Sequence, residues 1–280
     1  MQQRRFHQLD VFTAVPLKGN PLAVVHDAQG LSDETLAAFA RWTNLSETTF
    51  LLPPTDPAAD YRVRIFTPGG ELPFAGHPTL GSCHAWLAAG GVPRSADSVV
   101  QDCGVGLVRI RRQGGRLSFA APPLRRSGPL EPTLVQRIAD LLGVARRDVL
   151  HHHWVDNGPG WCAVMLHSAA QVLACRPDPV LLGEIRLGVV GKQPAGHEAM
   201  FEVRVFVPSL GVGEDPVTGS LNASLAQWLI GSERFAPPYL ASQGTLLGRT
   251  GRPRISREAD GSIWVGGATH TIVQGTVRLG

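Results

Sequence analysis

The chain has 280 residues, 43% of them hydrophobic and 18% charged, with a net charge of +3. This is the composition of a globular protein of about two domains with a substantial buried core. The arginines are spread along the chain, and the cluster Arg109–Arg116 alternates with apolar residues, so we expect solvated strand faces and no nucleic-acid-binding surface. The apolar runs fall short of the roughly 20 residues of a membrane span, and Met1–Leu9 lacks the apolar core of a signal peptide. We therefore expect a cytoplasmic protein that does not bind membranes.

The first predicted element is a helix over Leu31–Trp42. Ser32 is a suitable N-cap, Asp33 and Glu34 favour the positive end of the helix dipole, and Leu31 can pack on Leu36. Such a pattern is typical of an amphipathic helix on one face of a sheet.

A polar segment, Ser46–Thr49, follows this helix and leads into apolar Phe50–Leu52. Partial desolvation at such a position raises the pKa of a carboxyl group and suits it to general acid/base catalysis. Glu47 is therefore a candidate acid/base residue. From spacing alone, a solvated turn glutamate is the simpler interpretation.

The next predicted elements are a strand over Val63–Phe66, a turn over Glu71–Thr79 and a helix running to Leu87. We expect Pro78 at the first helical position, where its missing N–H has no consequence. Gly76 and the titratable His77 lie in the turn itself.

An internal repeat relates the two parts of the chain. Arg62–Pro68 and Glu202–Pro208 match at an offset of 140, whereas Glu71 matches Glu214 and Gly76 matches Gly219 at an offset of 143. We infer a duplication, with halves at residues 1–125 and 126–280 and a last strand free to pack on the first half.

The second half repeats the pattern with a strand over Val203–Val207, a turn over Gly213–Ser220 and a helix to Leu229. The tail Leu246–Leu279 alternates with period two, which predicts antiparallel strands. The order of strands and helices is not a strict βαβ repeat, so the predicted class is α+β.

The two turns predict an anion site, because helix N-termini present unpaired N–H groups and positive charge. If both helices begin where the halves meet, Gly76 and Gly219 lie across one cleft, and a substrate carboxylate fits it. Alternatively, the glycines only permit tight turns. His151–His153 and the four cysteines lack metal-ligand spacing, so we expect no metal site and free thiols.

Five motifs together resemble the phenazine-biosynthesis PhzF isomerase family. They are Gly19–Val24, Asn44–Thr48, Phe66–Pro78, Asn157–Pro159 and Glu214–Ser220, and they span nearly the whole chain in the family's order. The resemblance implies a diaminopimelate-epimerase-like fold with two pseudo-symmetric halves, each a curved sheet around a central helix. It also implies a homodimer that needs no cofactor.

The resemblance further implies roles for single residues. Glu47 matches the proton-shuttling glutamate, and His77 and Asp215 match the pair that binds and orients the substrate. The residues that match the lining of the substrate and its carboxylate are Ser46, Gly76, Gly219 and Ser220. The implied reaction is a proton shift on a small carboxylated, cyclic substrate, as in the isomerisation of trans-2,3-dihydro-3-hydroxyanthranilate.

Epimerases and racemases of this fold use one cysteine from each half, and Ala75 and Thr218 stand at the matching positions here. This departure favours a one-sided isomerase over a two-base racemase. Two alternatives stay open: an epimerase of the same fold, and a metabolite-binding protein that has lost turnover.

Overall fold

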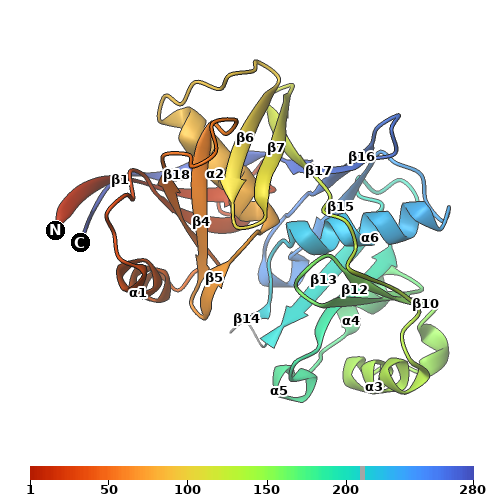
Figure 1. Ribbon diagram of the computed structural model, residues 1–280. Coiled ribbons are helices and arrows are strands. Elements are labelled where there is room, and N and C mark those ends of the chain that lie inside the picture. Colours follow the sequence, from red (N-terminus) through yellow and green to blue (C-terminus); the bar gives the residue numbers. More distant parts are fainter. Residues whose placement is uncertain (209–211) are drawn as a thin grey trace. The chain divides into compact units, whose positions relative to one another are not determined.

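The computed structural model describes residues 1–208 and 212–280 of the chain. The chain forms two compact units: unit 1 comprises Met1–Ala120 and Gly266–Gly280, and unit 2 comprises Ala121–Val265 (Figure 1). The sequence predicted the division at residue 125. The chain enters unit 2 earlier because the Ala121 N–H already bonds to the Ile263 carbonyl of that unit.

Unit 1 is built on a mixed sheet. Its strands are β1 (Gln2–Val11), β2 (Asn20–Val25), β3 (Thr48–Leu52), β4 (Tyr61–Thr67), β5 (Gly70–Leu72), β6 (Ser98–Cys103), β7 (Gly106–Gln113), β8 (Arg116–Ala120) and β18 (Thr269–Leu279). The strand order is β18-β1-β2-β3-β4-β6-β7-β8, with the short β5 also paired to β4. The β2–β3 and β4–β6 pairs are parallel, and the others are antiparallel.

The last strand of the chain belongs to unit 1. β18 runs antiparallel to β1 from Thr269 opposite Val11 to Leu279 opposite Gln2. Figure 1 shows the result, with the two chain ends side by side. The segment Gly266–Gly280 therefore extends the sheet of the first half although it follows the second half in sequence.

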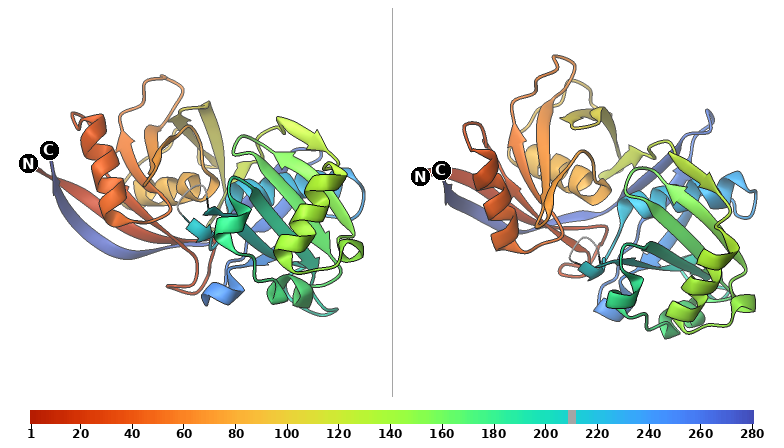
Figure 2. Two further views of the ribbon diagram at one scale, coloured as in Figure 1. Left: turned by 90° about the horizontal axis from the view of Figure 1, so that it is seen from below. Right: turned by 60° about the horizontal axis from the view of Figure 1, so that its bottom comes forward.

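The two helices of unit 1 have different surroundings. Helix α1 (Asp33–Thr43) begins at the N-cap Ser32, whose hydroxyl accepts the Thr35 N–H at 3.2 Å. It packs its Phe39 against Phe50 of β3. Helix α2 (Gly76–Ala88) contacts β1, β2, β3, β6, β8 and β18 and is buried on almost every side. Both views of Figure 2 show α1 at the outside of this unit and α2 within its curved sheet.

The start of α2 corrects one expectation. Ala75 is the N-cap, so Gly76 and His77 precede Pro78, which is the third helical residue and not the first. The first helical hydrogen bond runs from the Thr79 N–H to the Ala75 carbonyl. Proline is tolerated at this third position for the expected reason, because its N–H would still have no partner within the helix.

Unit 2 repeats the topology of unit 1. Its strands are β9 (Arg126–Gly128), β10 (His151–Asp156), β11 (Trp161–Leu166), β12 (Arg186–Lys192), β13 (Phe201–Val207), β14 (Val212–Glu214), β15 (Tyr239–Gln243) and β16 (Arg254–Arg257), and β17 (Ile263–Gly267) leads back to unit 1. The order is β9-β10-β11-β12-β13-β15-β16, with β11–β12 and β13–β15 parallel. β14 pairs with β13 as β5 pairs with β4. The duplication read from the sequence therefore appears strand by strand.

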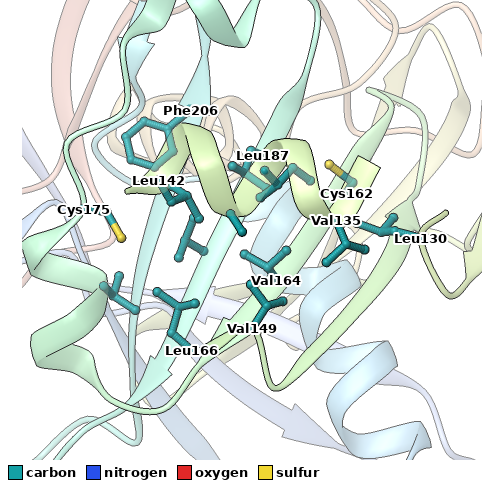
Figure 3. Packing of buried hydrophobic residues seen from close by; sticks show 14 of the residues in the cluster. Leu130, Val135, Leu142, Val149, Cys162, Val164, Leu166, Cys175, Leu187 and Phe206 are labelled. Atoms are coloured by element: carbon teal, nitrogen blue, oxygen red, sulfur yellow. The ribbon is translucent and has the colours of Figure 1, made fainter. Parts of the chain in front are cut away.

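Helix α6 (Gly219–Gly231) takes the place in unit 2 that α2 takes in unit 1, and most of its residues are buried. The other helices in the described part of unit 2 are α3 (Pro132–Leu142), α4 (Ala169–Ala174) and α5 (Pro179–Leu182), with 3-10 turns η1 (Arg146–Asp148) and η3 (Thr245–Leu247). Figure 3 shows the cluster in which Val135 and Leu142 of α3 pack with Val164 and Leu187 of the strands. Across the described residues, no helix is both long and apolar enough for a membrane span.

The repeat extends to a pair of side chains. In unit 1, Arg64 of β4 binds Glu71 of β5 through Nε–Oε1 at 2.7 Å and a second nitrogen–oxygen contact of 2.6 Å. In unit 2, Arg204 of β13 binds Glu214 of β14 in the same way, at 2.9 and 2.8 Å. The sequence matches at offsets of 140 and 143 thus reflect one contact that is repeated in the two halves.

Candidate active site

The loop between β1 and β2 positions Asn20 through the contacts of the preceding residue, Gly19. A side chain at Gly19 would collide with the Val11 carbonyl oxygen, so only glycine allows this approach. The Gly19 N–H donates to Asp10 Oδ1 at 2.9 Å. Asn20 follows as the fully buried first residue of β2, with its Nδ2 3.4 Å from Nδ1 of His77.

Glu47 and His77 meet in unit 1. Glu47 lies between the end of α1 and the start of β3, as the sequence predicted. Its Oε2 is 3.4 Å from Nε2 of His77, the second residue of α2. The two side chains are only 15% and 4% exposed, so this carboxylate is largely withdrawn from water and is not a solvated turn residue.

His77 is neutral near pH 7. Burial lowers its pKa to about 3, although a hydrogen bond to the Pro21 backbone opposes this shift. Nε2 makes no hydrogen bond within the described part of the chain, so we assign the proton that bonds to the Pro21 carbonyl to Nδ1. In this tautomer the 3.4 Å contact between Nδ1 and Nδ2 of Asn20 joins two donors and is not a hydrogen bond. The lone pair of Nε2 then faces Glu47, which places a proton acceptor beside the carboxyl group.

The N-terminus of α2, which carries His77, has no capping side chain. Its N-cap is Ala75, which has no polar side chain, and its first turn contains no acidic residue. The N–H groups of Gly76 and His77 therefore carry the positive end of the helix dipole without a capping side chain. Ser46, which directly precedes Glu47 in the chain, is partly buried.

Asp215 is part of a tightly bonded turn in unit 2. Its N–H donates to the Val205 carbonyl at 2.9 Å, and its Oδ2 accepts a short hydrogen bond from the Thr218 hydroxyl. Thr218 is the N-cap of α6 but makes no capping hydrogen bond with its side chain. The turn therefore orients a carboxylate beside a second uncapped helix N-terminus.

Gly219 and Ser220 are the first two residues of α6. Ser220 is held by two neighbours: Nδ2 of Asn157 donates to its carbonyl at 2.9 Å, and Nε1 of Trp161 donates to its hydroxyl at 3.2 Å. Ser220 thus takes the helical position in unit 2 that His77 takes in unit 1.

Each unit gathers its own candidate residues. Unit 1 brings Glu47 and His77 into contact, and unit 2 places Asp215 in the turn that leads to Gly219 and Ser220. Gly76 and Gly219 both begin a central helix, as expected. That they lie across one cleft stays a prediction.

Three residues that contact the candidate residues were not predicted from the sequence to do so. Asn20 contacts His77, Asn157 bonds to Ser220, and the hydroxyl of Thr218 bonds to Asp215. Asn20 and Asn157 stand in the segments Gly-Asn-Pro and Asn-Gly-Pro, which served only to identify the family. A buried asparagine in a turn motif next to predicted strands is the signal that could have found them, because such a side chain needs hydrogen-bond partners.

The thiols are poorly suited to act as bases. Ala75 and Thr218 are the N-caps of α2 and α6, so they occupy equivalent positions in the two units, and neither is a cysteine. All four cysteines are buried. Burial raises the pKa of Cys83 in α2 strongly and that of Cys162 to about 12, which leaves little thiolate at neutral pH.

The buried histidines predict a pH-dependent stability. Burial lowers the pKa of His26 to about 4 and that of His77 to about 3, from 6.5. Below pH 6.5 the unfolded chain binds protons that the folded chain does not, so stability falls as pH falls. At pH 5.5 each of these two histidines costs roughly 1.4 kcal/mol, so together they contribute about 3 kcal/mol to the loss relative to pH 7.5.

Urea unfolding at both pH values measures this loss. His26→Gln keeps a hydrogen-bonding partner for His7, which contacts His26 at 2.7 Å, and should reduce the loss by roughly 1.4 kcal/mol. The matched variant His167→Gln, at a half-exposed histidine, should leave it unchanged. Equal stability of the wild type at pH 5.5 and 7.5 would contradict the prediction.

Comparison with known proteins identifies relatives over the whole chain. The family model "PhzC-PhzF: Phenazine biosynthesis-like protein" matches residues 9–275. The chain is 36% identical to antisense-enhancing sequence 1 of Schizosaccharomyces pombe, covering 98% of this chain and 99% of the relative. It is 35% identical to trans-2,3-dihydro-3-hydroxyanthranilate isomerase of Pseudomonas aeruginosa, covering 92% and 91%.

Solved structures agree with these relatives. A PhzF-family protein of Enterococcus faecalis superposes with a TM-score of 0.82 at 22% identity, covering 99% of this chain and all of that one. A hydroxyproline epimerase of Agrobacterium vitis shares the fold at a TM-score of 0.59 and 13% identity, covering 98% and 92%. The α+β, epimerase-like fold expected from the sequence is thus confirmed, and the chain belongs to the PhzC-PhzF family of phenazine biosynthesis-like proteins, a family of isomerases.

Proposed function

We propose that this isomerase shifts a proton within a small, cyclic, carboxylate-bearing substrate without a cofactor, and that Glu47 is its acid/base. One observation carries the proposal: the withdrawn Glu47 carboxyl group lies 3.4 Å from Nε2 of a neutral His77, beside an uncapped helix N-terminus.

The proposed chemistry is an intramolecular proton shift. The Glu47 carboxylate takes a proton from an acidic C–H carbon of the substrate, and the electron pair of that bond moves into the conjugated system. Glu47 then returns the proton to another carbon, so the product has the same atoms and the same charge as the substrate. The lone pair of His77 Nε2 can accept a hydrogen bond from protonated Glu47 and hold it in place between the two steps.

The N–H groups of Gly76 and His77 are the proposed donors to the substrate carboxylate in unit 1. An anion gains most from a helix N-terminus that has no capping side chain and lies away from water. Fixed backbone dipoles also stabilise negative charge that spreads toward the carboxylate in the transition state. In unit 2, Asp215, Gly219 and Ser220 have the proposed role of binding and orienting the substrate.

The proposed substrate is trans-2,3-dihydro-3-hydroxyanthranilate or a cyclic acid closely related to it. The support is the 35% identity to the Pseudomonas aeruginosa isomerase named for that compound. The homodimer implied by the family stays a prediction.

NMR in D₂O with the wild-type enzyme tests the proposal. With dihydrohydroxyanthranilate, we expect one C–H signal to disappear and either a new C–H or a C–D group to form elsewhere in the ring. If this first compound is not converted, related cyclic acids are tried, because its failure counts only against that substrate. Stereochemical inversion at one carbon without a shift of the proton to another carbon would support the epimerase alternative. Binding without any exchange of a substrate C–H proton would support the alternative of a metabolite-binding protein that has lost turnover.

A further inference from the structure

A buried glutamine organises the turn that carries Asp215. Gln243 ends β15 and is fully buried. Its Oε1 accepts the Thr218 N–H at 3.0 Å and Nδ2 of Asn222 at 2.8 Å. Its Nε2 donates to the Asp215 carbonyl at 3.1 Å and to the Thr218 hydroxyl at 3.0 Å. Both ends of this amide therefore bond to the same short turn and to the helix that follows it.

The direction of these hydrogen bonds is determined. A backbone N–H can only donate and a backbone carbonyl can only accept, so the Thr218 N–H and the Asp215 carbonyl fix which end of the Gln243 amide is oxygen. Nε2 then donates to the Thr218 hydroxyl oxygen. The single hydroxyl proton of Thr218 is left to point at Asp215 Oδ2, where the short hydrogen bond is found.

The same bonds explain why α6 is uncapped. A threonine at the N-cap ordinarily accepts a hydrogen bond from an N–H of the first helical turn. Thr218 makes no such bond; its hydroxyl is directed to Gln243, from which it accepts, and to Asp215, to which it donates. Gln243 thus keeps the hydroxyl away from the helix amides, which remain available to an anion.

We propose that Gln243 is a positioning residue: through the Thr218 hydroxyl, it holds one oxygen of Asp215 as an acceptor and keeps the N-terminus of α6 open for substrate. The effect on catalysis rests on the proposed function, in which Asp215 orients the substrate. The hydrogen-bond direction itself does not depend on that function and can be measured without substrate.

Gln243→Met and Thr218→Val interrupt this arrangement at two points. Both should reduce kcat/KM about ten- to a hundredfold, because Thr218→Val removes the hydrogen bond to the Asp215 carboxylate and Gln243→Met removes the donor that directs it. The double variant should be no worse than the more impaired single variant, since both act along one path. Thr218→Ser keeps the hydroxyl and should recover most of the activity lost in Thr218→Val.

A matched control is Gln227→Met. Gln227 is a partly buried glutamine of α6 whose Nε2 donates to the Pro122 carbonyl at 3.0 Å, so its replacement removes a glutamine hydrogen bond outside the Asp215 turn. Its kcat/KM should stay at the wild-type level.

Proton NMR of the free protein supplies the substrate-free measurement. The Thr218 hydroxyl proton should give a slowly exchanging signal in the wild type and in Gln227→Met, and none in Gln243→Met. If Gln243→Met does not fold, Thr218→Val with its serine rescue tests the same path. Persistence of the hydroxyl signal in Gln243→Met, or additive losses in the double variant, would overturn the proposal. A wild type with the hydroxyl signal but no isomerase activity would instead contradict the proposed function.

Discussion

Replacement of Glu47 by glutamine should reduce kcat by about two to four orders of magnitude with little change in substrate affinity. Glutamine keeps the size of the side chain but cannot take a proton from carbon. Its amide can still donate a hydrogen bond to Nε2 of His77, 3.4 Å from the present carboxylate, so the pocket should keep its shape. The measurement is steady-state kinetics together with a ligand dissociation constant for each protein.

Glu34→Gln is the matched control, since Glu34 is an exposed glutamate in the first turn of α1. This variant should have wild-type kcat and the same circular dichroism spectrum as Glu47→Gln. A Glu47→Gln enzyme as fast as the wild type on any accepted substrate would remove Glu47 from the mechanism. A loss of affinity equal to the loss of kcat/KM would mean that Glu47 binds substrate and transition state alike.

Much of the fold was predictable because the relevant signals are local or repeated. Alternating β-branched and aromatic residues predicted the strands that contain Val63 and Val203, and both are central strands of their sheets. The cap at Ser32 fixed the start of α1 to within a residue or two. The repeat added the equivalence of Gly76 and Gly219, which begin the two central helices.

Features that depend on distant partners were not predictable in the same way. For the last strand the sequence left open whether it packs on the first half, because nothing within Thr269–Leu279 specifies the strand it pairs with. Its pairing with β1 assigns it to unit 1. The contact of Asn20 with His77 joins residues 57 positions apart. The hydroxyl of Thr218 is suited to cap a helix, and only Gln243, 25 residues later, directs it to Asp215.

The two copies of the arginine–glutamate pair allow a direct comparison of burial. The Arg204 and Glu214 side chains are 6% and 12% exposed, whereas Arg64 and Glu71 are 21% and 41% exposed. Arg204→Met should therefore lower the free energy of unfolding by about 3–5 kcal/mol, because it leaves a buried carboxylate without its partner. Arg204 also donates to the Val172 and Cys175 carbonyls, which lose a donor as well.

Arg64→Met is the matched variant in unit 1 and should cost about 1 kcal/mol or less, since water can solvate the Glu71 carboxylate once the guanidinium is gone. Urea unfolding of both variants, followed by circular dichroism, measures the two losses. High salt should weaken the Arg64 pair more than the Arg204 pair, because buried charges are screened less. Equal losses from the two replacements would show that the repeated contact, and not its burial, determines how much each pair stabilises its unit.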